Sequence, residues 1–323
     1  MPRHATLAAL LSCLALTACG GGGGGSPSTS ASTSSSGSTV TATGLYTRQP
    51  DIAACDPGQL ADSERTNLLN ALNSLRALHR LPALTYDALS NDDVARSALL
   101  GVANATLTPT PAKSLLCYSD AGYRGSSQSD LYLFVGSGVA APGTVDALAS
   151  LIRDEGQDSL GHRRTLLDPF LSQTALGRVD GKPLTGSNAE LAAAVSIKVI
   201  GYPDANLSQT SIDYVAVPEG DYPARYFNRN SQLSFTVLAD RSSPYNNGAS
   251  QVNLSAATVS VSDANGNPVA ISGLSAEYSN YGVPNVLRWR LPTLATGTRY
   301  TVQISGIKVG GVSRNTQYSF RVQ

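Results

Sequence analysis

Residues 161–169 read Gly-His-Arg-Arg-Thr-Leu-Leu-Asp-Pro, and residues 151–155, shortly before them, read Leu-Ile-Arg-Asp-Glu. The chain has only three histidines, and His162 is the one that stands among charged and glycine neighbours. Glu155 lies near the expected end of a helix, so its carboxylate and the imidazole can share one cleft. Such a pair is suited to acid–base chemistry or to the beginning of a metal site. We therefore take Glu155 and His162 as the candidate catalytic pair.

Three segments with helical periodicity precede residues 161–169. Apolar residues recur at helical spacing in three segments, which are residues 63–79, a segment that begins after an N-cap at Ser90, and a segment that Thr144 caps and that carries Glu155 at its C-terminal end. Residues 192–200 alternate between apolar and smaller or polar side chains, as a strand does. Helices that flank a small sheet form an α/β sandwich.

Several short motifs carry a resemblance to a known family. Residues 69–76 (Leu-Asn-Ala-Leu-Asn-Ser-Leu-Arg) and the Leu-Pro-Ala-Leu of residues 81–84 are similar to the first two helices of the CAP superfamily (SCP-like proteins). The Gly-His-Arg-Arg of residues 161–164, with Leu166, Leu167 and Pro169 and then Ala-Leu-Gly at 175–177, resembles the bacterial form of the CAP signature. The resemblance spans residues 60–203 and implies the α-β-α sandwich of that family.

The resemblance also implies a cleft, because CAP domains often carry two His and two Glu there, sometimes around zinc. Glu155 and His162 match one acidic and one His position by their spacing, and Asp130 stands where the family's Gly-Glu-Asn segment is expected. The second His, expected at residues 106–110, is absent. A stable zinc site needs three or four well-placed ligands. We therefore expect no metal or other cofactor, and a bound zinc ion is the alternative. Arg163 is a further candidate binding residue, because its guanidinium can bind a carboxylate or a phosphate.

Structural roles are the alternatives for the same residues. Glu155 is then a solvated residue at a helix end, or a partner of Arg163 or Arg164. His162 bonds to a backbone carbonyl beside a tight turn at Gly161, and the two arginines are solvated.

The first residues have the pattern of an export signal. Arg3 precedes an apolar run that is too short to span a bilayer, and Leu-Thr-Ala-Cys at residues 16–19 closes it. This resembles the lipobox of bacterial lipoproteins, which implies that Cys19 is acylated and anchors the protein in the cell envelope, at the outer membrane by analogy. An ordinary secretory signal is the alternative. Residues 20–45 are almost wholly Gly, Ser, Thr, Ala and Pro, which is typical of a disordered tether.

The net charge and the cysteine content indicate which partners and which disulfide to expect. The formal net charge is zero, so there is no basic field that would recruit nucleic acid. Once Cys13 leaves with the signal and Cys19 carries lipid, Cys55 and Cys117 remain, and an oxidising compartment favours a disulfide between them. Two free thiols are the alternative.

The pattern changes in the last third of the chain. Short alternating runs predict strands, over residues 233–238, 257–262, 269–273, 286–291, 300–306 and 317–322. Residues 202–223 read as a crossing loop, Asn265-Gly266 is a hairpin signal, and Trp289 is the expected core aromatic. The pattern resembles an immunoglobulin- or fibronectin-type β-sandwich. We therefore expect a CAP-like domain over residues 46–217, and an all-β sandwich over residues 218–323.

These features favour an envelope lipoprotein with a binding module rather than an enzyme. Its expected partners are the membrane, through the lipid anchor, and an unidentified small ligand, glycan or protein, but no nucleic acid. The alternatives are a metal-dependent or acid–base hydrolase that uses Glu155 and His162, and a passive surface spacer or adhesive protein without a site.

The lipid anchor can be tested directly. Cells that express the wild-type chain and are fed a palmitate probe should label it, and Cys19→Ser should abolish the label because the acyl acceptor is gone. Label that survives in Cys19→Ser would contradict the lipobox interpretation.

Overall fold

The computed structural model describes residues 44–185 and 189–323. The expected signal, Cys19 and nearly all of the tether lie outside these ranges. From residue 44 onward the described chain belongs to one compact unit with a mixed α/β fold and several sheets. No helix within the described ranges is both long and apolar enough to cross a membrane.

The elements of the N-terminal part are β1 (Tyr46–Arg48), β2 (Gln59–Leu60), α1 (Asp62–Leu78), β3 (Thr85–Tyr86), η1 (Ala88–Ser90), α2 (Asn91–Asn104), α3 (Asp120–Ser127), β4 (Ser129–Gly136), α4 (Thr144–Arg153), α5 (Gly161–Leu166), β5 (Gln173–Gly181) and β6 (Leu191–Lys198). Those that follow are β7 (Tyr214–Val217), β8 (Gly220–Tyr222), β9 (Leu233–Val237), η2 (Pro244–Asn247), β10 (Val252–Asn253), β11 (Thr258–Ser262), β12 (Pro268–Val269), β13 (Ser272–Glu277), β14 (Val286–Arg290), β15 (Arg299–Val309) and β16 (Val312–Val322).

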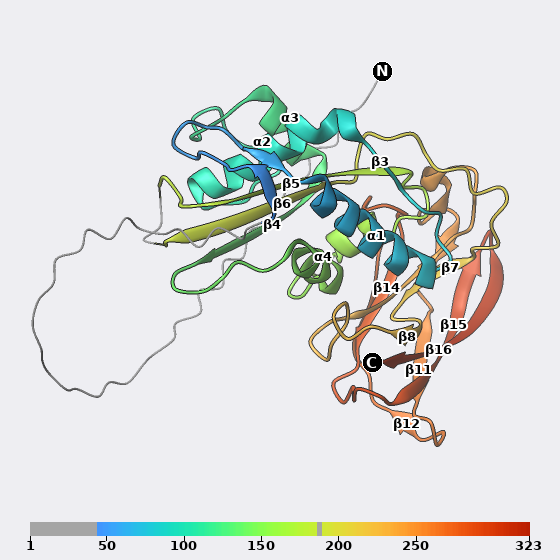
Figure 1. Cartoon of the computed structure of the whole chain (residues 1–323). Helices are drawn as coiled ribbons and strands as arrows, with labels where there is room; N and C mark the ends of the chain where they lie inside the picture. Colours follow the sequence, from blue (N-terminus) through green and yellow to red (C-terminus); the bar gives the residue numbers. More distant parts are fainter. Residues whose placement is uncertain (1–43, 186–188) are drawn as a thin grey trace, which may run out of the picture. The chain divides into compact units, whose positions relative to one another are not determined.

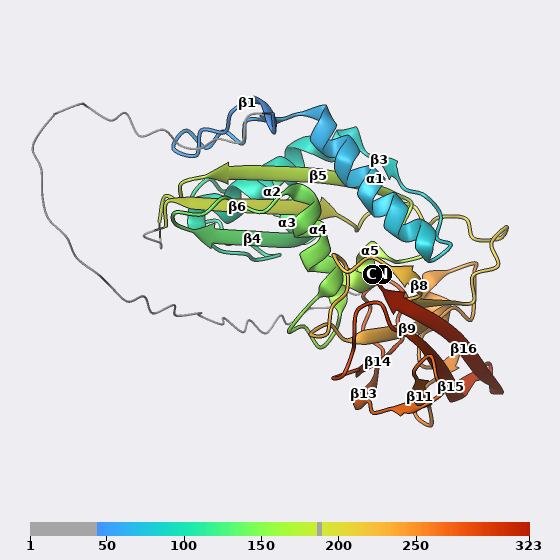
Figure 2. The same ribbon diagram turned by 60° about the horizontal axis from the view of Figure 1, so that its bottom comes forward.

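The N-terminal sheet has the strand order β3-β5-β6-β4, with β3 parallel to β5 and the other pairs antiparallel. Helix α2 packs on β5 and β6, while α1 contacts β5 and α4 contacts β4. Figures 1 and 2 show α2 and α3 on one face of this sheet and α4 on the other. Both faces are therefore covered, which explains why β6 is buried along nearly its whole length and not on alternate residues only.

Helix α1 forms where its leucines repeat, and Leu68, Leu72 and Leu75 are fully buried in the core. It also buries Arg76 completely. The guanidinium donates hydrogen bonds to four backbone carbonyls, which belong to Pro82, Leu166, Asp168 and Leu171. Because three of these follow the end of α5 or lie in its last turn, Arg76 fixes the loop that joins α5 to β5.

Two helix starts differ from the sequence prediction. Ser90 stands at the N-cap of α2, but its hydroxyl does not cap the helix: it donates to Asp87 and lies 2.8 Å from the ammonium of Lys198. Helix α4 has Gly143 at its N-cap, and Thr144 is its first residue. The Thr144 hydroxyl donates to Glu64 of α1 instead. Both hydroxyls therefore bond to side chains outside the helix that each was expected to cap.

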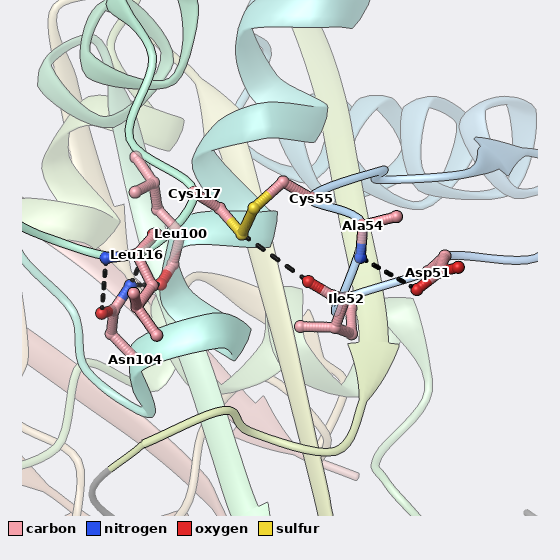
Figure 3. The surroundings of a disulfide bond; sticks show 8 residues. All are labelled: Asp51, Ile52, Ala54, Cys55, Leu100, Asn104, Leu116 and Cys117. Atoms are coloured by element: carbon pink, nitrogen blue, oxygen red, sulfur yellow. Dashed lines mark hydrogen bonds between the residues drawn. A yellow bond between two sulfur atoms is a disulfide. The ribbon is translucent and has the colours of Figure 1, made fainter.

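The predicted disulfide between Cys55 and Cys117 is present (Figure 3). It fastens the segment that precedes α1, residues 44–60, which we call the N-terminal arm. The arm forms the two-stranded sheet β1-β2, and Ile52 packs in a small apolar cluster with Leu99 of α2 and Val179 of β5. In the chain-entropy model, closing a loop of this length contributes about 4 kcal/mol.

The remaining strands form two sheets, β13-β14-β9-β7 and β12-β11-β15-β16-β8, with β10 paired to β15. The hairpin predicted at Asn265-Gly266 joins β11 to β12, and Trp289 of β14 is fully buried as expected. The strand predicted over 269–273 is wrong, because the chain leaves β12 in one sheet and enters β13 in the other. The crossing loop predicted over 202–223 is also wrong in part, since it contains β7 and β8.

Strand β7 lies at the boundary that the sequence predicts between the two domains. The boundary expected between residues 217 and 218 falls directly after it, yet β7 pairs with β9. A continuous apolar core also runs from Leu72 of α1 through Leu148 of α4 to Trp289 of β14. The two halves of the described chain therefore share buried surface.

Removing the guanidinium of Arg76 should be costly. Arg76→Met keeps a long apolar stem but leaves four carbonyl oxygens without their donor, and each buried unsatisfied group costs about 1–3 kcal/mol. We expect a loss of about 3 kcal/mol or more in the free energy of unfolding, measured by urea denaturation.

The matched control is Arg48→Met, in the exposed part of the arm, which should change stability little. Equal stability of Arg76→Met and wild type would mean that water satisfies these carbonyls.

Candidate functional site

The partner of His162 is Asp154, not Glu155. Helix α4 ends at Arg153, and Asp154 follows in the left-handed conformation (φ 50°, ψ 41°), which Asp tolerates better than most residues. This turn directs the Asp154 carboxylate inward, where its side chain is only 1% exposed. One oxygen lies 2.8 Å from Nδ1 of His162, and the other accepts the backbone N–H of Arg163.

His162 lies in the first turn of α5, with its side chain 35% exposed. Burial alone would lower the pKa of His162. The hydrogen bond to Asp154 and the charges of Asp130 and Asp154 outweigh burial and raise this pKa to about 9. At pH 7 the ring is therefore an imidazolium, and its Nδ1–H donates to Asp154. Among the residues that the structure describes, none bonds to Nε2, so this second N–H is free to donate to an external group.

Asp130 is the second carboxylate near the ring, as the sequence suggested. It is the second residue of β4, it is 7% exposed, and its carboxylate accepts the hydroxyl of Thr165 at 2.7 Å. Burial raises the pKa of Asp130 to about 7, although the charge of His162 and the Thr165 hydrogen bond both favour the ionised form. Asp130, Asp154 and His162 therefore form one group of charges that act on one another.

Glu155 does not contribute to this group. Its carboxylate pairs with Arg153 and accepts a hydrogen bond from the amide of Asn228, and its side chain is 38% exposed. The candidate pair Glu155–His162 is thus corrected to Asp154–His162. The sequence carried one signal for this: an Asp at the end of a helix, two residues before Gly156, is typical of a left-handed turn that reverses a side chain inward.

Arg163 is not available to bind a ligand. It is 1% exposed, and its guanidinium donates to the carbonyls of Ile152, Arg153 and Gln232 and to the hydroxyl of Ser234. With every N–H that faces the core engaged, its role is structural, which corrects the sequence prediction.

Arg164 is buried in the same way. It pairs with Glu277 and donates to the carbonyls of Ser159, Ser279 and Val283. A cavity of about 20 Å³ beside Arg163 and Arg164 has room for one water molecule only.

The described residues contain no group of three or more His, Cys, Asp or Glu side chains arranged to hold a metal ion. The donors at this site are one imidazole and two carboxylates, one of which is an acid with a pKa near neutrality. Zinc binding here would require displacing the proton that the carboxylates hold on the imidazole.

Comparison with known proteins adds no assignment. No known protein family matches the chain, and a search of curated proteins finds no match. The site must therefore be interpreted from its own geometry.

The orientation of His162 predicts its titration. Asp154→Asn removes the charge and the strongest acceptor beside Nδ1, so the pKa of His162 should fall from about 9 toward or below its ordinary value. Imidazole NMR shifts followed from pH 5 to 10.5 measure this. His79 serves as an internal reference, because burial lowers its pKa to about 3.

Glu155→Gln is the matched control and should leave the titration of His162 unchanged. The raised pKa of His162 also makes stability depend on pH. Because this pKa rises from 6.5 in the unfolded chain to about 9 in the folded chain, protonation of His162 stabilises the fold fully below pH 6.5. That contribution is lost as the pH rises through 9. An unchanged His162 titration in Asp154→Asn would contradict the assignment of Asp154 as its partner.

Proposed function

We propose that this protein is an envelope-anchored lipoprotein whose N-terminal part is a CAP-like binding module, and that His162 is its recognition residue. The observation that carries the proposal is the partly exposed imidazolium, which Asp154 orients and whose Nε2–H has no partner within residues 44–185 and 189–323. A group in this state donates a strong, charge-assisted hydrogen bond to an oxygen of a ligand. Carbonyl, hydroxyl and carboxylate oxygens of a glycan, a peptide or a small molecule all fit this chemistry.

The layered arrangement supports the CAP-like part of the proposal. The sheet β3-β5-β6-β4 lies between α2 and α4, as an α-β-α sandwich requires. The Asn and Arg of the first CAP helix have counterparts with defined roles: Asn73 exchanges two hydrogen bonds with the backbone of Leu84, and Arg76 holds the loop after α5. The two C-terminal sheets likewise support an immunoglobulin- or fibronectin-type sandwich.

Protonation favours binding over base catalysis. A general base must be unprotonated at the working pH, and the pKa of His162 near 9 leaves only about one ring in a hundred neutral at pH 7. Asp130 has the pKa of a good base, about 7, but its carboxylate is buried and occupied by Thr165. Neither group is therefore both accessible and deprotonated.

A hydrolase is the second candidate, and one observation favours it. An imidazolium held by a carboxylate, with a neighbouring acid that titrates near pH 7, can protonate a leaving group while Asp130 takes up or releases a proton. In this alternative Asp154 replaces Glu155 as the partner of His162.

Soluble peptidoglycan fragments are the probe that separates these candidates, because they are abundant in the envelope and rich in carbonyl and hydroxyl oxygens. We expect them to shift the Nε2 resonance of His162 in the full-length protein. His162→Ala should weaken binding at least tenfold, because the charge-assisted hydrogen bond is worth about 1.5–3 kcal/mol.

Glu155→Gln, which leaves the imidazolium intact, should bind as wild type does. Products that accumulate with wild type and not with His162→Ala would favour the hydrolase. Fragments that leave the Nε2 resonance unmoved would contradict the proposal that His162 recognises envelope glycans or peptides.

A further inference from the structure

A larger cavity lies away from His162, under the N-terminal arm. Its volume is about 230 Å³, and it is open to solvent on one side. The arm segment 57–60 forms one wall, and the opposite walls come from the first turns of α2 and from residues 176–178 of β5. Arg65 of α1 also lines it. The disulfide that fastens the arm therefore holds one wall of this cavity in position.

The floor of the cavity is an unpaired stretch of sheet edge. Strand β3 pairs with β5 only at Gln173 and Thr174, and no strand in the described chain continues the pairing along residues 176–178. The N–H of Leu176 points away from β6, because it donates to the hydroxyl of Tyr86. In an antiparallel strand the N–H and C=O of alternate residues share one side. The carbonyl of Leu176 and the N–H of Arg178 therefore face outward at this edge.

Arg65 supplies a cationic donor that is incompletely used. Its Nη1 donates to the carbonyl of Leu60 and to Asp62, whose side chain is 97% exposed and therefore strongly screened by water. Its Nε is buried and has no hydrogen-bond partner among the residues that the structure describes. Because Nε is buried, an occupant of the cavity can meet the guanidinium only at its outer nitrogens.

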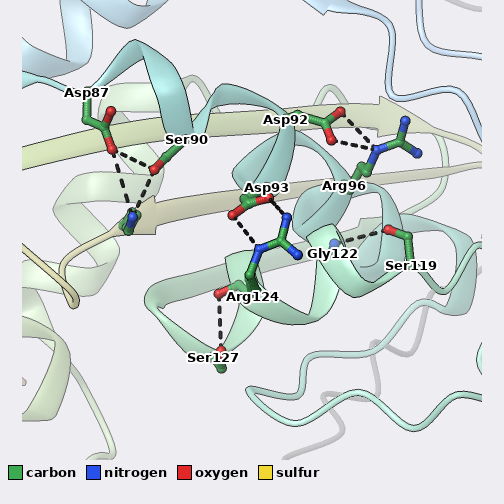
Figure 4. Close-up of polar contacts among 10 residues, drawn as sticks. Asp87, Ser90, Asp92, Asp93, Arg96, Ser119, Gly122, Arg124 and Ser127 are labelled. Atoms are coloured by element: carbon green, nitrogen blue, oxygen red, sulfur yellow. Dashed lines mark hydrogen bonds and ion pairs between the residues drawn. The ribbon is translucent and has the colours of Figure 1, made fainter.

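The other lining groups set the charge and polarity of the occupant. The carboxylate of Asp92, which also lines the cavity, is engaged by Arg96 in a two-oxygen contact (Figure 4). Arg178 is neutralised by Asp180. Leu60 and Ala95 provide apolar surface. The cavity thus combines the guanidinium of Arg65, which also interacts with the hydroxyl of Tyr86, with one pair of backbone groups in strand geometry and an apolar wall.

We infer that this cavity binds an amide group followed by a carboxylate, which is the chemistry of a peptide carboxy-terminus or of a free N-acylated amino acid. The carboxylate accepts from the outer nitrogens of the Arg65 guanidinium and from the outward N–H of Arg178. The amide N–H donates to the outward carbonyl of Leu176, so that the bound residue extends the sheet. The side chain of the bound residue packs on Leu60 and Ala95. This site shares no residue with the His162 site.

N-acetyl-L-leucine and its amide, N-acetyl-L-leucinamide, are the matched probes, since they differ only in the carboxylate. Binding to the full-length protein is measured by calorimetry and by backbone NMR shifts of residues 57–60 and 176–178. We expect the acid to bind at least tenfold more tightly than the amide. In Arg65→Gln this preference should disappear, while Arg48→Gln, elsewhere on the arm, should retain it.

Two further comparisons secure the test. Arg65→Gln can also loosen the arm, so Ala95→Leu, which fills the cavity and leaves Arg65 intact, should abolish binding of both probes. N-acetyl-Ala-Ala-Leu distinguishes the sources: tighter binding than N-acetyl-L-leucine indicates a peptide terminus, and equal binding indicates a free acylated amino acid. Equal affinity for acid and amide in wild type, or probes that leave the shifts of both segments unchanged, would overturn the inference.

Discussion

The buried guanidinium of Arg163 is the interaction on which the arrangement of the site depends. It donates to the carbonyls of Ile152 and Arg153 at the end of α4, and to Gln232 and Ser234 next to and within β9. A guanidinium with no carboxylate in direct contact is expensive to bury, and burial lowers its pKa. It is tolerated because its donors meet fixed carbonyls, which also satisfy the end of a helix. One side chain thereby joins α4, α5 and a C-terminal strand.

This junction explains why His162 meets Asp154. With α4 tied to α5 through Arg163, the turn after α4 must close within a few residues, and Asp154 takes the left-handed conformation that reverses the chain. Its carboxylate then faces the start of α5, where the N–H of Arg163 and Nδ1 of His162 are the nearest donors. The geometry of the pair is therefore a consequence of packing as much as of attraction between charges, because the backbone bond would remain if the imidazole were removed.

The sequence predicted the elements of the fold better than the partners within the site. Helical periodicity located α1 within one residue at each end, because its leucines bury one continuous stripe. The same reasoning chose Glu155 over Asp154, since it assumed that the helix continued, and one residue of helix rotates a side chain by about 100°. Arg163 was taken for a binding residue because no local pattern reports a contact with Gln232, far along the chain. The strand predicted over residues 269–273 was wrong for a related reason. The change from one sheet to the other depends on tertiary packing, which no local pattern reports.

The charges near His162 limit the chemistry of the site more than its residue types do. A His with two acidic neighbours is the composition of a metal or acid–base site. Here both carboxylates are buried, so their fields are weakly screened and act on the ring together. They hold a proton on the imidazole well above neutral pH, while the loss of solvent keeps one of them, Asp130, partly protonated itself. The group therefore retains protons that a metal or a base mechanism would need removed. Burial of the two carboxylates therefore leaves the ring as a hydrogen-bond donor that stays charged across the physiological range, and its Nε2 has no partner among the described residues.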